Sequence, residues 1–294
     1  MEPAVLDAAT LEKLISAAVA APSMLRAQPW RYRLNPDTVT LEVRAAPEHG
    51  LRQADPTGRA LCVSAGAAVC NLRVAVAHFG WEPVVRLLPH RSQPNLLATV
   101  GLAVPPYGAA APHPDGLYDM IWRRPGSRFP FPGRRLPPTE LGVFAEAARG
   151  DGATLYSAGP EETARLLRLT AEAERRTAEA QLEHAAIVGR VRESRPTIAV
   201  LTTAHDRRAD WLRAGQALEH VLLLATAHGI RASLLHQALE WSDLRWALSD
   251  GRRAPGHVQM LIRLGPGVNG TEAGVSGPEA VRPTPVACRR PGAR

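Results

Sequence analysis

The sequence predicts an α+β fold built of two homologous halves, and three observations carry that prediction. Two long helical stretches, 55–81 and 206–231, share small residues at an offset of 149 positions: Ala65, Gly66, Ala68 and Gly80 correspond to Ala214, Gly215, Ala217 and Gly229. Each stretch is followed by two apolar, strand-like runs. A Pro-rich segment, 105–114, separates the two patterns. Self-similarity at one offset is typical of a duplicated structural unit.

The strand-like runs are 82–88 and 96–103 in the first half, and 230–235 and 258–264 in the second. Glycine precedes the first run of each pair, at a place typical of the residue that ends a helix. The unit repeated along the chain is therefore predicted to be helix, strand, strand.

The first half begins with a predicted amphipathic helix, in which the apolar spacing is i, i+3, i+4, i+7 from Leu11 to Ala18 and which Pro22 ends. Alternating apolar residues over 30–34 and 39–43 then predict a hairpin. In the second half, interspersed Glu and Arg over 161–192 predict a long, partly exposed helix.

Small residues on the two long helices allow close approach of helix backbones. A tightly packed core helix would explain each stretch alone, whereas the duplication favours packing of the two helices on each other, as in an isologous dimer. We therefore expect an intramolecular pseudo-dimer that acts as a monomer, with a first half at 1–108 and a second half at 109–294.

Composition excludes several classes of function. The 294 residues are 45% apolar, enough for a buried core, and the net charge of +7 comes from scattered Arg, since Lys13 is the only lysine. Scattered charge without a basic stripe argues against nucleic-acid binding. Cys62, Cys70 and Cys288 form neither a zinc spacing nor an even disulfide set, which indicates no metal and a cytoplasmic location. Neither a signal peptide nor a membrane span is expected.

The segment Ala21 to Arg31, APSMLRAQPWR, joins a helix end to a strand, where a loop either only connects or holds a ligand. It resembles the A-P-S-x-x-N-x-Q-P-W loop of the flavin-dependent nitroreductase family. The stretches 55–59 (DPTGR), 64–72 (SAGAAVCNL), 209–215 (ADWLRAG) and 259–265 (QMLIRLG) extend the resemblance. More narrowly, the chain is similar to the fused, Acg-like members of actinobacteria, whose halves are divergent copies of the usual subunit.

The resemblance implies the nitroreductase fold and bound FMN. Family dimers hold each flavin between the Pro-Ser loop of one subunit and an Arg motif of the other. Here the loop occurs only in the first half, and the motif, 123–131 (RRPGSRFPF), only in the second. The implied count is therefore one FMN, held between the halves.

The candidate flavin-binding residues fall into four groups. They are Pro22, Ser23, Arg26 and Gln28 in the loop; Arg124 and Arg128 for the phosphate; Ser233, Leu234, Leu235 and Gln237 along the ring; and Arg289 and Arg290 in the tail. Guanidinium groups suit a phosphate dianion because they donate paired, charge-assisted hydrogen bonds. The tail arginines would equally serve solubility, and His236 or Gln237 would equally be a surface residue. Arg26 replaces the usual Asn of the loop, and Pro125 with Gly126 replaces a polar pair.

The resemblance implies an FMN-dependent oxidoreductase of ping-pong type, in which NAD(P)H reduces the flavin and a nitroaromatic, quinone or biosynthetic intermediate reoxidises it. The side chains offer no assignable catalytic acid or base, so the catalytic residues are unknown. Two alternatives stay open: a non-catalytic protein that binds or sequesters FMN, and a flavin-dependent oxidase or desaturase. A flavin-free structural protein is a third, favoured by Pro125 and Gly126.

Overall fold

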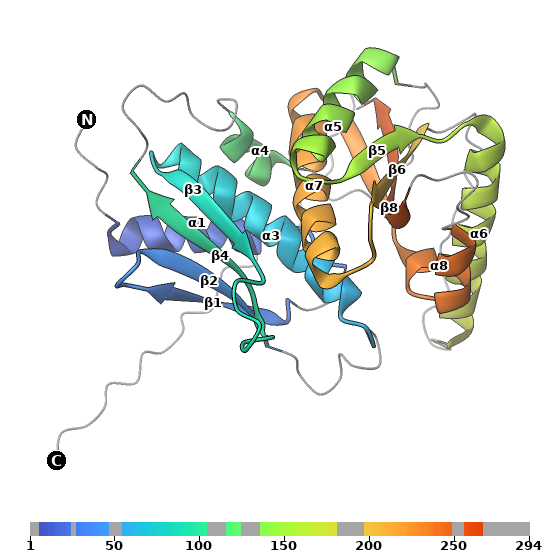
Figure 1. Cartoon of the computed structure of the whole chain (residues 1–294). Coiled ribbons are helices and arrows are strands. Elements are labelled where there is room, and N and C mark those ends of the chain that lie inside the picture. The colour runs from blue at the N-terminus through green and yellow to red at the C-terminus, as the bar shows by residue number, and fades with distance from the viewer. Residues whose placement is uncertain are drawn as a thin grey trace.

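A computed structural model describes residues 6–24, 28–46, 55–104, 116–124, 136–180, 197–248 and 256–266. In the first half, a four-stranded antiparallel sheet packs against two helices (Figure 1). The elements are α1 (Ala8–Val19), β1 (Trp30–Asn35), β2 (Thr40–Ala45), α3 (Arg59–His78), β3 (Glu82–Leu87) and β4 (Leu96–Ala103). The strand order is β1-β2-β4-β3, and the predicted hairpin is the β1-β2 pair.

The second half repeats this arrangement. Its corresponding elements are α5 (Pro138–Gly150), β5 (Thr154–Ser157), β6 (Thr197–Thr203), α7 (Arg208–Ala227), β7 (Ile230–Leu235) and β8 (His257–Pro266). The sheet order, β5-β6-β8-β7, matches the first sheet strand by strand. A register shift interrupts the equivalent pair in each sheet, between Val43 and Arg44 and between Leu201 and Thr202. The repeat is therefore twice as long as the predicted helix, strand, strand.

Two insertions distinguish the second half. The helix α6 (Pro160–Ala180) follows β5, where the first half has only the turn at 36–39. The short helices η1 (Gln237–Leu239) and α8 (Ser242–Leu248) lie between β7 and β8. The helix predicted over 161–192 is α6, and its remaining part, 181–192, lies outside the described residues, as does the predicted boundary at 105–114.

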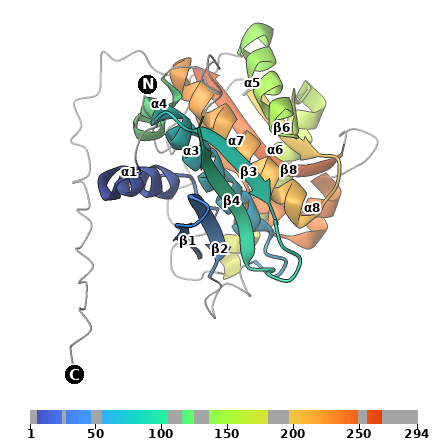
Figure 2. The ribbon, with the colours of Figure 1, turned by 60° about the vertical axis from the view of Figure 1, so that its left-hand side comes forward.

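The helices α3 and α7 lie side by side at the centre of the molecule, between the two sheets (Figures 1 and 2). At their crossing, a Cβ added to Gly66 would lie 2.2 Å from the Leu212 carbonyl oxygen, and one added to Gly215 would lie 2.0 Å from the Val63 carbonyl oxygen. Only glycine fits such an approach. The two contacts are reciprocal at the same offset of 149 residues, which is the pattern of an isologous interface.

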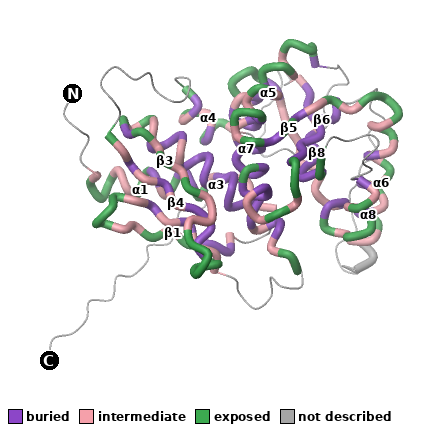
Figure 3. The backbone as a smooth tube through the Cα atoms, viewed as in Figure 1, coloured by how far each residue is buried: buried purple, intermediate pink, exposed green. Residues whose placement is uncertain are grey.

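Both central helices are buried over most of their surface (Figure 3). The helix α3 is long and apolar enough to cross a membrane, but 83% of its most apolar window is buried inside the protein, as in a core helix. The predicted helix-ending glycines are confirmed, since Gly80 and Gly229 have φ of +91° and +67°.

Candidate functional site

The described part of the predicted flavin loop follows the end of α1 and contacts α3. The Met24 amide donates to Ser64 Oγ at 2.9 Å, and the Ser64 hydroxyl in turn donates to a carbonyl of its own helix. At the other end of the loop, Gln28 Nε2 donates to the Val19 carbonyl at 2.7 Å. Polar contacts to α1 and α3 therefore fix the described ends of the loop.

Two side chains, one on α3 and one directly after α4, donate hydrogen bonds to carbonyls at the C-terminal end of α1. Arg124, which follows α4 (Leu117–Arg123), donates from Nη2 to the Ala20 carbonyl at 2.9 Å. Asn71 donates from Nδ2 to the Ala17 carbonyl at 3.0 Å. Because a helix C-terminus carries partial negative charge, a guanidinium is favourable there. The structure thus brings Arg124 to the base of the Pro-Ser loop.

Glu219 of α7 lies behind Arg124 and has no solvent exposure. Its Oε1 is 3.7 Å from Arg124 Nε, and neither of its carboxyl oxygens has a donor at full hydrogen-bonding geometry among the described residues, the nearest being the Asn71 amide. Burial raises the pKa of Glu219 to about 7, although Arg124 and the nearby Asn71 amide act in the opposite direction. Arg124 Nε and Asn71 Oδ1 are also buried without a described hydrogen-bond partner. The adjoining side chains of Glu219, Arg124 and Asn71 therefore each have at least one buried polar atom without a described hydrogen-bond partner.

A second polar junction joins the start of α3 to the second half. Buried Arg59 donates from Nε to Gln259 Oε1 at 3.1 Å and from Nη2 to the Gln259 carbonyl. Gln259 Nε2 donates at 3.1 Å to Asp206, which also accepts from Trp211 Nε1 at 2.6 Å and from Arg245. Arg59 and Gln259 both belong to stretches that carry the family resemblance, so those stretches hold the two halves together.

The residues predicted along the flavin ring lie on β7 and η1. Ser233, Leu234 and Leu235 are half-buried and pair with β8. Gln237 begins η1, and its Oε1 is buried without a hydrogen-bond partner among the described residues. His236 Nδ1 lies 2.6 Å from a Glu240 carboxyl oxygen. None of the contacts above joins this group to Arg124.

The remaining predicted residues, Arg26, Arg128, Arg289 and Arg290, lie outside the described part of the chain, as do Pro125 and Gly126. Pro22 and Ser23 are half-buried in the loop. The sequence analysis missed Glu219. The available signal was a carboxylate in the run 217–223, which is apolar apart from Glu219 and His220, because an acidic residue in a core helix is rarely there without a partner.

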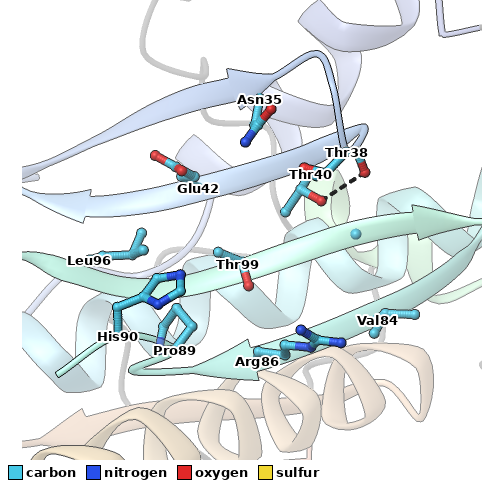
Figure 4. Close-up of a pocket in the computed structure, with 11 residues that line it drawn as sticks. Asn35, Thr38, Thr40, Glu42, Val84, Arg86, Pro89, His90, Leu96 and Thr99 are labelled. Atoms are coloured by element: carbon cyan, nitrogen blue, oxygen red, sulfur yellow. Dashed lines mark hydrogen bonds between the residues drawn. The ribbon is translucent and has the colours of Figure 1, made fainter. Parts of the chain in front are cut away.

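Two hollows lie elsewhere. One, of about 470 Å³, opens on the first sheet, with Thr38, Glu42 and Arg86 on its walls (Figure 4). Another, of about 920 Å³, lies beside α5, where Asp151 pairs with Arg73 and His220. Neither contains a predicted site residue. We place the candidate site at Arg124, because predicted flavin residues and unused buried polar atoms coincide there.

The described residues contain no group of three His, Cys, Asp or Glu side chains placed to hold a metal ion. Cys62 and Cys70 are buried free thiols on α3. Burial raises the pKa of both, which keeps them protonated at neutral pH.

Comparisons with known proteins agree with the resemblance. No family model matches the chain. The "Putative NAD(P)H nitroreductase Rv3131" of Mycobacterium tuberculosis is 30% identical over 88% of this chain and 86% of its own length. The "Putative NAD(P)H nitroreductase acg" of the same species is 26% identical over 96% and 93%.

Among solved structures, an FMN-bound nitroreductase from Bacteroides fragilis is 17% identical and aligns with a TM-score of 0.42, covering 59% of this chain and 100% of that one. A likeness of that degree adds nothing to the sequence match. The sequence match to Rv3131 covers 88% of this chain, so it extends into both halves. On that ground, the chain belongs to the nitroreductase family.

Proposed function

We propose that this protein is an FMN-dependent oxidoreductase, in which NAD(P)H reduces a single flavin and a small organic acceptor reoxidises it. The proposal includes an intramolecular pseudo-dimer that works as a monomer in the cytoplasm. The observation that carries it is the contact of Arg124 with the base of the Pro-Ser loop, because this contact joins the two family motifs at one place.

The polar groups at the candidate site suit the parts of FMN. Arg124 uses Nη2 on the Ala20 carbonyl, and its Nε faces Glu219 at 3.7 Å. A guanidinium has five N–H donors in a planar fork, so donors remain for a phosphate. Gln237 Oε1, also buried without a described partner, offers an acceptor of the kind that a flavin ring N–H needs. Buried polar atoms without partners are rare in native proteins and call for a ligand or water.

The residues of this chain would bind and orient the cofactor. FMN, when bound, supplies the hydride chemistry, and the protein supplies placement and electrostatics. Arg124 and Arg128 would hold the phosphate, Ser23 and Gln28 would line the loop side, and the half-buried run from Ser233 would border the ring.

Asymmetry between the halves supports one flavin per chain. The Pro-Ser loop follows α1, whereas the corresponding connection after α5 leads through only three residues to β5. The helix α4 contacts both central helices, and Arg124 at its end donates to the Ala20 carbonyl beside the loop. A twofold-related site would lack both the loop and the arginine.

The proposal is tested by titrating flavin-free protein with FMN, following quenching of flavin fluorescence, with riboflavin as the ligand that lacks the phosphate. We expect saturable FMN binding and much weaker riboflavin binding. Equal affinity for both would contradict the phosphate site, and absence of FMN binding would contradict the cofactor assignment.

Anaerobic mixing of the FMN-loaded protein with NADH and with NADPH tests catalysis. Bleaching by either, followed by recovery on addition of a quinone, is the expected result. Flavin that neither nucleotide bleaches would instead favour the sequestering protein or an oxidase with another reductant.

A further inference from the structure

A buried carboxyl group lies directly behind the arginine assigned to the flavin phosphate. Glu219 comes from α7 in the second half, and its Oε1 is 3.7 Å from Arg124 Nε, too far for a hydrogen bond. Neither of its oxygens has a donor at full hydrogen-bonding geometry among the described residues, although the Asn71 amide lies close enough to favour the ionised form, and the side chain is fully buried. A structural ion pair in such a place is normally hydrogen-bonded, because desolvation otherwise outweighs the attraction.

Arg124 is held on its other side by the Ala20 carbonyl at 2.9 Å. Its guanidinium therefore stands between the loop base and Glu219. We propose that Glu219 is a positioning residue of the flavin site: it shares the Arg124 cation with the flavin phosphate and takes up a proton when FMN binds. This inference rests on the proposed function, because it requires the phosphate to bind at Arg124.

The physical reason is competition between two anions for one cation. A delocalised guanidinium carries a single positive charge, so a phosphate dianion at its free edge brings negative charge close to Glu219. Like charges disfavour the ionised form of a carboxyl group. Glu219 already starts with its pKa raised to about 7 by burial, so a further rise converts ionised carboxylate to acid near neutral pH.

The surroundings of Glu219 leave Arg124 as its main charged partner. Among the described residues, Arg124 is the only charged group whose field shifts its pKa. From α3, the Cys70 thiol faces it and stays neutral, because burial raises the pKa of that thiol. Beyond Cys70, Asp151 at the end of α5 is paired with Arg73 and His220, which lower its pKa against the effect of burial.

The linkage has a definite sign. FMN binds better to the protonated form of Glu219, so affinity falls as pH rises through about 7. If bound phosphate raises the pKa by about one unit, affinity changes at most about tenfold, because one unit of pKa corresponds to one decade in the binding constant. Riboflavin, without the phosphate, would show no such dependence.

The test measures FMN affinity of the full chain from about pH 6.5, above the second pKa of the phosphate, to about pH 8.5, for wild type, Glu219→Gln and Asp210→Asn. Glutamine has the size of glutamate without its charge. Asp210 is a mostly buried carboxylate on the same helix that pairs with Arg213 instead, so it controls for loss of one acidic group from α7. Calorimetry in two buffers of different ionisation enthalpy counts the protons taken up.

We expect FMN affinity to fall roughly sixfold across this range in wild type and Asp210→Asn, and less than about twofold in Glu219→Gln. Wild type should take up a fraction of a proton at about pH 7.5, and Glu219→Gln should take up none. Parallel pH profiles of wild type and Glu219→Gln would overturn the inference while leaving the flavin site intact. Absence of FMN binding in wild type would overturn both. Should Glu219→Gln not fold, proton uptake by wild type with FMN but not riboflavin supports the inference, and equal uptake with both refutes it.

Discussion

Substitution of Gly215 by Ala tests the crossing of the two central helices. The added Cβ would lie 2.0 Å from the Val63 carbonyl oxygen and 2.8 Å from Gly66 Cα, whereas ordinary contacts are 3.4–4 Å. The obstructing atoms are backbone, so the helices must separate along their buried interface. Overpacking costs about 1–3 kcal/mol, and a clash with backbone belongs at the upper end. After subtraction of the gain from removing a helical glycine, of roughly 0.5–1 kcal/mol, we expect a net loss of about 2 kcal/mol.

The assay is thermal and urea unfolding followed by circular dichroism, where this loss lowers the Tm by about 5 °C. Gly142 is the matched control, because it lies in α5 and a Cβ added there meets nothing within 4 Å. Gly142→Ala should be more stable than wild type by roughly 0.5–1 kcal/mol. If Gly215→Ala were stabilised to the same degree as Gly142→Ala, the close reciprocal crossing would be refuted.

Three further substitutions test the polar junctions. Arg124→Gln should weaken FMN binding about 10- to 100-fold by fluorescence titration, since a charge-assisted hydrogen bond contributes about 1.5–3 kcal/mol. The control is Arg123→Gln at the exposed neighbouring position, which should bind FMN as wild type does. Equal losses of affinity in both variants would contradict a specific role of Arg124. Arg59→Met removes the donor to Oε1 and to the carbonyl of buried Gln259 and should lower the free energy of unfolding by about 1–3 kcal/mol in urea, so an unchanged midpoint would count against the junction. The folded-state pKa of Glu219, about 7, exceeds the ordinary 4.5, so its stabilising effect is complete below about pH 4.5 and is lost as pH rises through 7. Flavin-free Glu219→Gln should therefore match wild type near pH 4 and exceed its stability near pH 8 by on the order of 3 kcal/mol, a difference that pH-independent unfolding curves would rule out.

The repeated small residues were enough to predict the arrangement of the central helices. Gly66 and Gly215 have a physical role that their spacing reveals, because small residues at one offset predict close approach of two equivalent helices. The hairpin and the last two strands of each half were predictable from period-two alternation or apolar runs bounded by glycine. In contrast, α5 and β5 went unpredicted: β5 has only 4 residues, and α6 separates it from the strand with which it pairs.

The candidate site was predictable only in part. The resemblance identified Arg124 and the Pro-Ser loop, and their contact at Ala20 places them together. The resemblance did not identify Glu219. The function of a buried carboxylate depends on the side chains that pack around it, and the neighbours of Glu219 come from α3 and the end of α4, far away in the sequence. Likewise, only the fold shows that Arg59 and Gln259 are partners, since 200 positions separate them.

The central claim is one flavin held between two unequal halves, and its most direct test is the number of FMN molecules bound per chain. Equilibrium dialysis of monomeric, flavin-free protein against FMN, followed by absorbance of the bound flavin, measures this number. We expect saturation at one FMN per chain, with that single site weakened in Arg124→Gln. Two equivalent FMN molecules per chain would contradict the asymmetry, and none at saturating FMN would contradict the site itself.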